Sequence, residues 1–400
     1  MFRKQKTIII YSHSLYIKQE KEISKIILPL ADPILKELVK SGYKLVWVFR
    51  NTSKLYSPKK KSYYSPITSI LQGLAVKLDS INRILNLKLI NKCFAKNLYI
   101  GFFERLFWYL IFIFHQPKLV IGIEVSQELC IVARSLKIKS IELEHGLRAL
   151  DSYYFRKDYR YTKSGYPDFL FYSKSKDFNI IKKLLPSYVS PIECGNIDLM
   201  HSKSEILETL SKPNISVKKS ILYASTYLKR GSDKPHQIPR KLLEITQSAN
   251  LLLIIRIHPK LAQNKNIFYK TIKYFEMQFN SLDFIINRKQ IIYSNPYETS
   301  LWSDIIRSKG MVTLNSTAFR YAYLLSKPVL VHSNKLNEFE IESHDKGLYG
   351  FKEKIDQELW EKFINKCLNN KNLLLSSFEK IVNAENKKMR NSLDIIYKNI

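Results

Sequence analysis

Three short segments of the chain carry side chains that could bind an anion or move a proton. The first is Glu144-His145-Gly146, which follows an apolar run typical of a strand. An imidazole at the end of a strand can take a proton from an acceptor hydroxyl near neutral pH. Glu144 could orient His145 or act as the base itself, so both are candidate catalytic residues. The alternative is a loop histidine beside a glycine turn, with no catalytic role.

The second segment is Arg256-Ile257-His258-Pro259-Lys260, at the end of the apolar run LLLIIRI. Pro259 fixes its own φ and holds His258 extended, so we expect the strand to end there. Arg256 and His258 share one face of the strand by period-two alternation. A guanidinium beside an imidazole suits a phosphate or a nucleotide base, so both are candidate donor-binding residues. The alternative is a simple strand-ending turn in which Pro259 is the breaker.

The third segment is Asn315-Ser316-Thr317, between the strand-like run GMVTL and the helix-like run TAFRYAYLL. Asn and Ser are good helix N-caps, which is the structural interpretation. The functional interpretation uses the same geometry, because a helix N-terminus offers free N–H groups and a positive dipole end to a phosphate. The hydroxyls of Ser316 and Thr317 would add donors.

The elements that must position these segments alternate between strands and helices. Thr7–Tyr11 and Lys44–Phe49 have the pattern of strands, and Glu22–Lys40 between them has helical spacing. Such a unit is right-handed and has parallel strands. Further strands are expected at Leu119–Glu124, Lys139–Leu143, Asp168–Ser173, Ile192–Gly195, Ser220–Ala224, Leu251–Ile257, Ile291–Ser294, Gly310–Leu314 and Pro328–His332. Further helices are expected at Phe102–Phe114, Gln127–Leu136, Lys176–Leu185, Ile238–Ser248, Asn266–Phe279, Glu298–Ile306 and Thr317–Leu325, and from Gln357 onward.

This alternation predicts an α/β protein with two Rossmann-like parallel-sheet domains that face a central cleft, followed by a helical C-terminal tail. We place the N-terminal domain at residues 1–200, a polar linker at 201–218, and the C-terminal domain with its tail at 219–400. Parallel sheets bind ligands outside the carboxyl ends of their strands, so we expect the site in the cleft.

The composition describes a basic globular protein. The 400 residues include 65 Lys and Arg against 35 Asp and Glu, a formal net charge of +30. The 45% apolar and 25% charged residues are ordinary for a folded domain, which excludes a disordered basic tail. The surface should attract nucleic acid, anionic lipid or phosphorylated small molecules. The alternative source of the charge is an AT-rich genome, because the chain is rich in Lys, Ile, Asn and Tyr, the pattern expected from such a genome.

Sequence motifs for cofactors and metals are absent. No GxGxxG follows the first strand, no GxxxxGK[ST] occurs, and the four cysteines are far apart with no Cys/His cluster. We therefore expect no cofactor, no metal and a reducing compartment. No helix-turn-helix, RNP or zinc module supports nucleic acid as a partner.

Two features bear on membranes. The run Leu106–Phe114 is shorter than the roughly 20 residues that span a bilayer, so it predicts a buried helix, with interfacial membrane contact as the alternative. Lys59-Lys60-Lys61 could hold the protein at an anionic membrane surface. The N-terminus has the pattern of a strand rather than a signal peptide. We expect a cytoplasmic protein, with peripheral attachment at the inner membrane left open.

The order of the segments resembles bacterial surface-polysaccharide transferases with the GT-B architecture. These are the capsular Kdo transferases, bacterial polysialyltransferases and CDP-glycerol glycerophosphotransferases. The resemblance covers roughly residues 100–335. The matching segments are Glu144-His145-Gly146, Ile221-Leu222-Tyr223-Ala224-Ser225-Thr226, Arg256-Ile257-His258-Pro259, Trp302-Ser303-Asp304, Ser316-Thr317 and Ser326-Lys327-Pro328-Val329.

The resemblance implies that His258, Ser316 and Thr317 hold the nucleotide phosphate of a CMP- or CDP-activated donor, and that His145 or Glu144 activates the acceptor. Two positions depart from the pattern. The chain has Tyr321 where the family often has Glu, which leaves the donor open, and Glu144 where the family has Gln, which leaves the base open.

The predicted function is therefore a metal-independent glycosyltransferase or glycerophosphotransferase of cell-surface polysaccharide. Its partners would be a nucleotide-activated donor and a polysaccharide or lipid-linked acceptor. A non-catalytic GT-B-like assembly protein and a basic nucleic-acid-binding protein are the alternatives.

Overall fold

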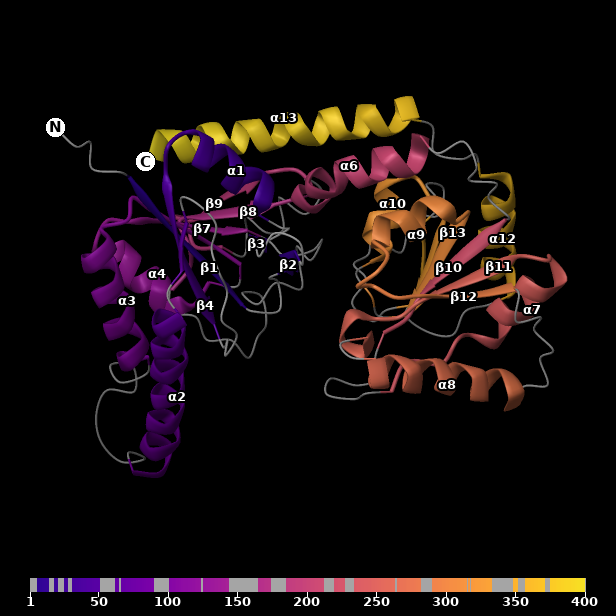
Figure 1. Cartoon of the computed structure of the whole chain (residues 1–400), viewed down its shortest axis with the longest axis horizontal. Helices are drawn as coiled ribbons and strands as arrows, with labels where there is room; N and C mark the ends of the chain where they lie inside the picture. Colours follow the sequence, from indigo (N-terminus) through magenta and orange to yellow (C-terminus); the bar gives the residue numbers. More distant parts are fainter. Residues whose placement is uncertain are drawn as a thin grey trace. The chain divides into compact units, whose positions relative to one another are not determined.

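The structure is a computed structural model, and the chain divides into two compact units (Figure 1). Unit 1 is Met1–His201 with Val382–Ile400, and unit 2 is Ser202–Ile381. The residues that the structure describes are 6–13, 18–20, 25–27, 31–50, 62–64, 66–89, 101–123, 125–143, 165–173, 185–211, 219–226, 234–262, 265–281, 290–314, 316, 318–332, 348–351, 357–370 and 375–399.

Unit 1 contains a seven-stranded sheet with the order β5-β4-β1-β6-β7-β8-β9, and every pair in it is parallel. Its strands are β1 (Thr7–His13), β4 (Lys44–Arg50), β5 (Ser62–Tyr64), β6 (Leu119–Gly122), β7 (Lys139–Leu143), β8 (Phe169–Tyr172) and β9 (Ser190–Glu193). Its helices are α1 (Asp32–Lys40), α2 (Pro66–Leu89), α3 (Phe102–His115) and α4 (Gln127–Ser135). A short antiparallel pair, β2 (Lys18–Glu20) and β3 (Lys25–Ile27), precedes α1.

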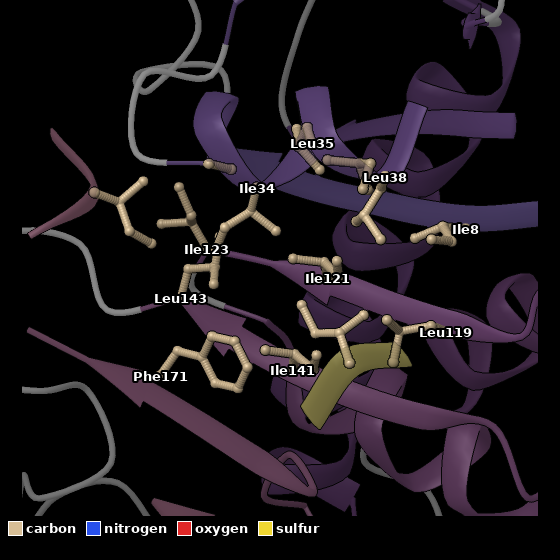
Figure 2. Packing of buried hydrophobic residues seen from close by; sticks show 14 of the residues in the cluster. Ile8, Ile34, Leu35, Leu38, Leu119, Ile121, Ile123, Ile141, Leu143 and Phe171 are labelled. Atoms are coloured by element: carbon tan, nitrogen blue, oxygen red, sulfur yellow. The ribbon is translucent and has the colours of Figure 1, made fainter. Parts of the chain in front are cut away.

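The core of unit 1 lies on both faces of this sheet, as a sheet covered by helices on both sides requires. Ile8 and Ile10 of β1 point into one cluster with α1, whereas Ile9 and Tyr11 point into the other with α3. All four side chains are fully buried. Figure 2 shows how the first cluster joins α1 to the middle strands.

The helix expected over Glu22–Lys40 is shorter in the structure. It begins at Asp32, with Pro33 in its first turn, where the missing N–H of proline costs nothing. It ends before Gly42, whose φ of +89° suits glycine at the turn into β4. Part of the expected helix, Lys25–Ile27, is strand β3.

Unit 2 contains a six-stranded sheet with the order β12-β11-β10-β13-β14-β15, and all its pairs are parallel. Its strands are β10 (Ser220–Ala224), β11 (Leu252–Arg256), β12 (Ile291–Ser294), β13 (Gly310–Leu314), β14 (Val329–His332) and β15 (Leu348–Phe351). Its helices are α7 (Arg240–Ser248), η4 (Pro259–Ala262), α8 (Lys265–Ser281), α9 (Leu301–Arg307), α10 (Phe319–Leu324) and α12 (Gln357–Asn369). A buried cluster that includes Tyr223, Phe275 and Phe363 forms its core.

Two helices contain the boundaries between the units, and both differ from the expected domain division. The polar stretch expected as a linker, residues 201–218, begins inside α6 (Ile197–Ser211), a regular helix. The final helix α13 (Leu375–Asn399) returns to unit 1, where Met389, Leu393 and Ile396 join the core beside β1. The last residues therefore belong to the first unit rather than to the C-terminal domain.

The fold class is confirmed: both units are Rossmann-like α/β layers around parallel sheets. The edge strands β5 and β15 were not predicted, and the expected helix Lys176–Leu185 lies almost wholly outside the described residues. Among the described helices, none combines the length and apolarity needed to cross a membrane.

Candidate functional site

The sheet of unit 2 places its six strand ends along one edge, because all the strands run in parallel. The strand order reverses between β10 and β13: β11 and β12 lie on one side of β10, and β13 to β15 on the other. In open α/β sheets the crevice for a ligand opens at this reversal, outside the carboxyl ends. The residues that follow β10, β11 and β13 are therefore the candidates for a site.

Two threonines join the strands at the reversal. Thr313 Oγ1 donates a hydrogen bond to the carbonyl of Ala224 at 2.8 Å, and Thr226 Oγ1 donates one to the carbonyl of Leu314 at 2.6 Å. The N–H of His236 donates to the carbonyl of Thr226 at 2.8 Å. These bonds hold the loop after β10 against the end of β13, so the backbone at the strand ends is fixed on both sides of the reversal.

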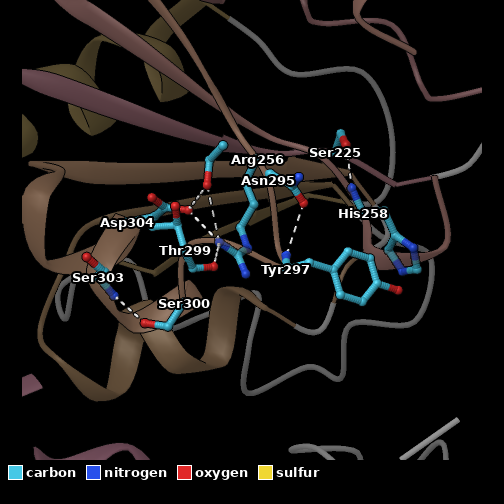
Figure 3. Close-up of polar contacts among 10 residues, drawn as sticks. Ser225, Arg256, His258, Asn295, Tyr297, Thr299, Ser300, Ser303 and Asp304 are labelled. Carbon is cyan, nitrogen blue, oxygen red and sulfur yellow. Dashed lines mark hydrogen bonds and ion pairs between the residues drawn. The ribbon is translucent and has the colours of Figure 1, made fainter. Parts of the chain in front are cut away.

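The turn around His258 is fixed in the same way. The N–H of His258 donates to Ser225 Oγ at 3.1 Å, and the carbonyl of His258 accepts from Leu261 at 2.8 Å, inside η4. Tyr297 Oη donates to the carbonyl of Pro259 at 3.2 Å from the turn after β12. Figure 3 shows the rings of His258 and Tyr297 beside this turn. The imidazole of His258 is partly buried at the carboxyl edge of the sheet.

Arg256 has a different place from the one expected. The residue is 9% exposed, and its guanidinium lies 2.6 Å from the carboxylate of Asp304 on α9. The same Nη1 donates to the carbonyl of Thr299 at 3.0 Å and to Ser294 Oγ at 3.3 Å, and Ser294 Oγ donates to Asp304 at 2.5 Å (Figure 3). The strand ends at Arg256, so alternation does not continue to His258. Arg256 therefore fixes the start of α9 from inside the unit, rather than pointing toward a ligand.

Ser316 has the role of a helix-start residue. Its Oγ accepts from the N–H of Ala318 at 3.2 Å, and α10 begins one residue after Ala318, at Phe319 rather than at the expected Thr317. Asn315 and Thr317 lie outside the described residues. With only six residues, α10 offers a weaker dipole than the sequence suggested, so the hydroxyl of Ser316 and the strand ends are the main polar features here.

The candidate catalytic residues Glu144 and His145 also lie outside the described residues. The strand before them is where the sequence placed it, since β7 runs from Lys139 to Leu143 and pairs in parallel with β6 and β8. Leu143 is therefore at the carboxyl edge of the unit 1 sheet.

Two further histidines belong to the carboxyl edge of unit 2 and were missed by sequence reasoning. His332 ends β14, in register with Leu314, and His236 is bonded to Thr226. Burial lowers the pKa of His236, and its electrostatic interaction with His332 lowers it further. His236 is therefore largely neutral near pH 7, with ring nitrogens suited to the hydroxyl or base of a nucleoside. Neither histidine lies in a motif, and only the sheet brings them to this edge.

The lysine of the Ser326-Lys327-Pro328-Val329 segment lies at the opposite edge. Lys327 Nζ donates to the carbonyls of Ser308 at 2.7 Å and Ile306 at 3.3 Å, at the end of α9 and before β13 begins. Burial lowers the pKa of Lys327 to about 8, with Lys309 adding to the shift. Lys327 therefore holds the amino edge of the sheet together and is no candidate for binding at the carboxyl edge.

The carboxyl edge thus offers hydroxyls, imidazoles and fixed backbone, a set suited to hydrogen-bonding a phosphorylated nucleoside. In the part of the chain that the structure describes, no group of three or more His, Cys, Asp or Glu side chains could hold a metal. Metal independence stays a prediction.

Solved structures share this two-unit fold. UDP-GlcNAc 2-epimerase from Methanocaldococcus jannaschii matches with a TM-score of 0.56 and 14% identity, over 98% of this chain and 99% of that chain. UDP-GlcNAc 2-epimerase from Neisseria meningitidis, bound to UDP-GlcNAc, matches with a TM-score of 0.51 and 15% identity, over 97% of this chain and 100% of that chain. UGT73P12 from Glycyrrhiza uralensis, complexed with glycyrrhetinic acid 3-O-monoglucuronide, matches with a TM-score of 0.51 and 8% identity, over 99% of this chain and 96% of that chain. These likenesses confirm the GT-B fold.

Neither a family model nor a curated protein matches the sequence.

Proposed function

We propose that the protein is a transferase of cell-surface polysaccharide synthesis that uses a nucleotide-activated donor. The observation that carries the proposal is the reversal of strand order between β10 and β13, where Thr226, Thr313 and the turn at His258 form a rigid polar edge. A rigid edge costs little further ordering when a ligand binds, which favours affinity. The donor nucleotide would lie along this edge.

In this proposal His258 and the hydroxyl of Ser316 contact the donor phosphates, with Thr317 and Asn315 beside them. Arg256 acts as a positioning residue, because its ion pair with Asp304 fixes the end of β11 and the start of α9. Glu144 or His145 would take the proton from the acceptor hydroxyl, which is a polysaccharide or a lipid-linked chain. These roles rest on the motif order and on the resemblance.

The set of candidate donor nucleotides is larger than the cytidine donors that the resemblance implies. A similar structure from Neisseria meningitidis is bound to UDP-GlcNAc, so a uridine nucleotide belongs in the proposal beside CMP and CDP. Tyr321, at the position where a Glu is common in the resembling transferases, packs edge-to-face on Trp302 at 5.0 Å between ring centroids. Tyr321 therefore helps to join α10 to α9 inside the unit.

A nucleotide-sugar epimerase is the second candidate. UDP-GlcNAc 2-epimerases match over nearly the whole of both chains, with no large insertion on either side. The two functions differ in what they need, because an epimerase converts a nucleotide sugar without an acceptor. Incubating the protein with UDP-GlcNAc alone and following the sugar by NMR separates them: an epimerised sugar favours the second candidate, and an unchanged sugar favours the transferase.

Donor binding is tested first, by a thermal-shift screen against CMP, CDP, UDP and GDP. We expect one nucleotide to raise the melting temperature, and His258→Ala to remove most of that rise. His115→Ala, in unit 1, is the matched control and should keep the full shift. If none of the four nucleotides stabilises the protein, a non-catalytic assembly role replaces the enzyme.

The catalytic step is tested in a transfer assay with the donor that binds. His145→Ala and Glu144→Gln separate the two candidates for the base, since the loss of a general base typically lowers kcat by about 10²–10⁴-fold. We expect one variant to show that loss with unchanged donor affinity. Full activity in both variants would overturn the assignment of this segment.

A further inference from the structure

The two longest helices near the N-terminus carry a band of exposed apolar side chains. On α2 the band consists of Ile67, Ile70, Leu71, Leu74 and Ile81, which are 49–68% exposed. On α3 it consists of Phe102, Leu106, Tyr109, Leu110, Ile113 and Phe114, which are 44–80% exposed. We call these residues the α2–α3 apolar face. Single exposed apolar residues are normal on a surface, but contiguous patches mark interaction sites.

The concentration of these residues distinguishes them from the rest of the surface. Of the 17 large apolar side chains that are exposed in the described part of the chain, 11 belong to α2 and α3. Their spacing follows the three- and four-residue period of a helix, so each helix has one continuous apolar stripe. The other six are scattered over five other elements and loops.

The stripes are not used by the core of unit 1. Ala75 of α2 and Phe107, Trp108 and Phe112 of α3 point inward, into one cluster on the face of the sheet that carries Tyr11. Both helices therefore cover the same face of the sheet, and in Figure 1 they lie next to each other. The stripes are on the opposite side of each helix from these inward residues, so both point away from the sheet in the same general direction.

The segment that contains α2 and α3 is rich in positive charge. The segment from residue 59 to residue 118 contains ten Lys and Arg residues and two acidic residues, Asp79 and Glu104. Both carboxylates point inward: they are 9% and 7% exposed, and Asp79 accepts hydrogen bonds from the N–H groups of Phe103 and Glu104. Lys77 and Lys118, by contrast, are exposed. The segment therefore presents an apolar face with positive charge and no exposed carboxylate among its described residues.

We infer that the α2–α3 apolar face attaches the protein to a membrane surface that contains anionic lipid. Apolar faces of amphipathic helices insert at the boundary between headgroups and acyl chains, and Lys or Arg residues near an anionic surface strengthen the attachment. Tyr109 has the amphipathic ring that is favoured at headgroup level. In this proposal the chain lies on the membrane surface through these two helices.

A second copy of the chain is a poorer occupant of the same face. In a two-fold dimer a patch meets itself, so the positive residues around one face would meet those of the other. Like charges across an interface oppose association. An anionic bilayer complements both the apolar and the charged character of the face.

The inference is tested by co-sedimentation of the full chain with vesicles of phosphatidylcholine alone or mixed with phosphatidylglycerol. We expect binding to the mixed vesicles, weakened by added salt. The double variant Ile70→Glu/Leu110→Glu changes two side chains that are 58% and 60% exposed, so it should fold normally, and we expect at least a tenfold loss of binding. Met277→Glu on α8, at a side chain 70% exposed in unit 2, is the matched control and should bind like the parent.

A separate variant tests how much positive charge contributes to vesicle binding. Lys77→Glu should weaken binding to the mixed vesicles by several-fold and leave any binding to phosphatidylcholine unchanged. The inference is overturned if the parent does not bind mixed vesicles, or if the double variant binds as well as the parent. If sedimentation velocity instead shows a dimer that only the double variant dissociates, with no vesicle binding, a second copy occupies the face. Nucleotide binding in solution is independent of this outcome, so the two proposals fail separately.

Discussion

In unit 2 the carboxylate of Asp304 lies 2.6 Å from the guanidinium of Arg256, with Ser294 and Thr299 completing their hydrogen bonds. In unit 1 the carboxyl group of Glu128, in the first turn of α4, is partly buried near Glu104 and Asp79, and a backbone hydrogen bond and Arg105 offset these carboxylates only in part. The first cluster is matched in charge and fixes a strand end of the candidate site. The second is mismatched, and burial with the two neighbouring carboxylates raises the pKa of Glu128 to about 7.

The difference shows two uses of buried charge. A matched pair positions its neighbours at all ordinary pH values, because neither partner gains by changing protonation. A mismatched group makes the stability of its surroundings depend on pH. Glu128 also lies against the start of α3, since a Cβ on Gly101 would collide with the Glu128 carboxylate. The pH dependence should therefore affect the layer that carries the apolar face.

The largest expected effect comes from breaking the matched pair. Asp304→Ala leaves a buried, uncompensated guanidinium and should lower the free energy of unfolding by about 3–5 kcal/mol. Urea denaturation at pH 7 measures it. The double variant Arg256→Met/Asp304→Leu removes both charges and should recover most of the loss, as apolar replacements of buried pairs do. A loss below about 1 kcal/mol in the single variant would mean that the pair is solvated and does not position the strand end.

The second effect concerns Lys327. Its folded pKa of about 8 is below the ordinary value of 10.5, so between these pH values the unfolded state holds a proton that the folded state lacks. The free energy of unfolding should therefore rise with pH across this window, by up to about 3 kcal/mol. Lys327→Met should lack this rise, which a comparison of the two proteins at pH 7.5 and pH 10 measures. Parallel curves for the two proteins would show that Lys327 keeps an ordinary pKa.

The third effect tests the mismatched cluster. Because the folded pKa of Glu128 is raised, its contribution to stability is present below pH 4.5 and is lost as the pH rises through about 7. Glu128→Gln removes the charge while keeping the shape. At pH 8 it should raise the free energy of unfolding by roughly 2 kcal/mol, and at pH 4.5 it should change it little. Equal effects at both pH values would contradict the raised pKa.

The smallest expected effect concerns Thr226 at the strand reversal, and it distinguishes a role in positioning the nucleotide site from a role in stability alone. Thr226→Val removes the hydrogen bond to Leu314 and should cost about 1 kcal/mol of stability. Thr271→Val removes a similar hydroxyl bond inside α8, at 2.9 Å, and should cost about as much. Only Thr226→Val should also weaken nucleotide binding, by several-fold. If both variants bind nucleotide like the parent, Thr226 has a purely structural role.

Sequence patterns predicted most of the fold because buried parallel strands are continuous apolar runs. LLLIIRI and GMVTL became β11 and β13 within one or two residues of the expected bounds. The edge strands β5 and β15 have weaker patterns, since an edge strand packs against one neighbour only. The return of α13 to unit 1 could not be predicted, because its contacts with β1 and α1 join residues more than 300 positions apart.

The sequence predicted that the Arg-x-His-Pro segment follows a buried strand, but it did not predict the contacts of these side chains. The histidine of the Arg-x-His-Pro segment lies at the carboxyl edge, whereas the arginine beside it is turned inward, because Asp304 on α9 offers it a carboxylate. That choice depends on a residue 48 positions away, which local alternation does not include. His236 and His332 were missed for the same reason: each is a lone histidine in the sequence, and the sheet alone brings them to one edge.

The central claim is that the carboxyl edge of the unit 2 sheet binds an activated nucleotide. Isothermal calorimetry with the best nucleotide of the thermal-shift screen tests it most directly, on the parent, His258→Ala and His115→Ala. We predict one site per chain, at least tenfold weaker binding in His258→Ala and unchanged binding in His115→Ala. Equal affinity in all three proteins would place the nucleotide elsewhere and contradict the account.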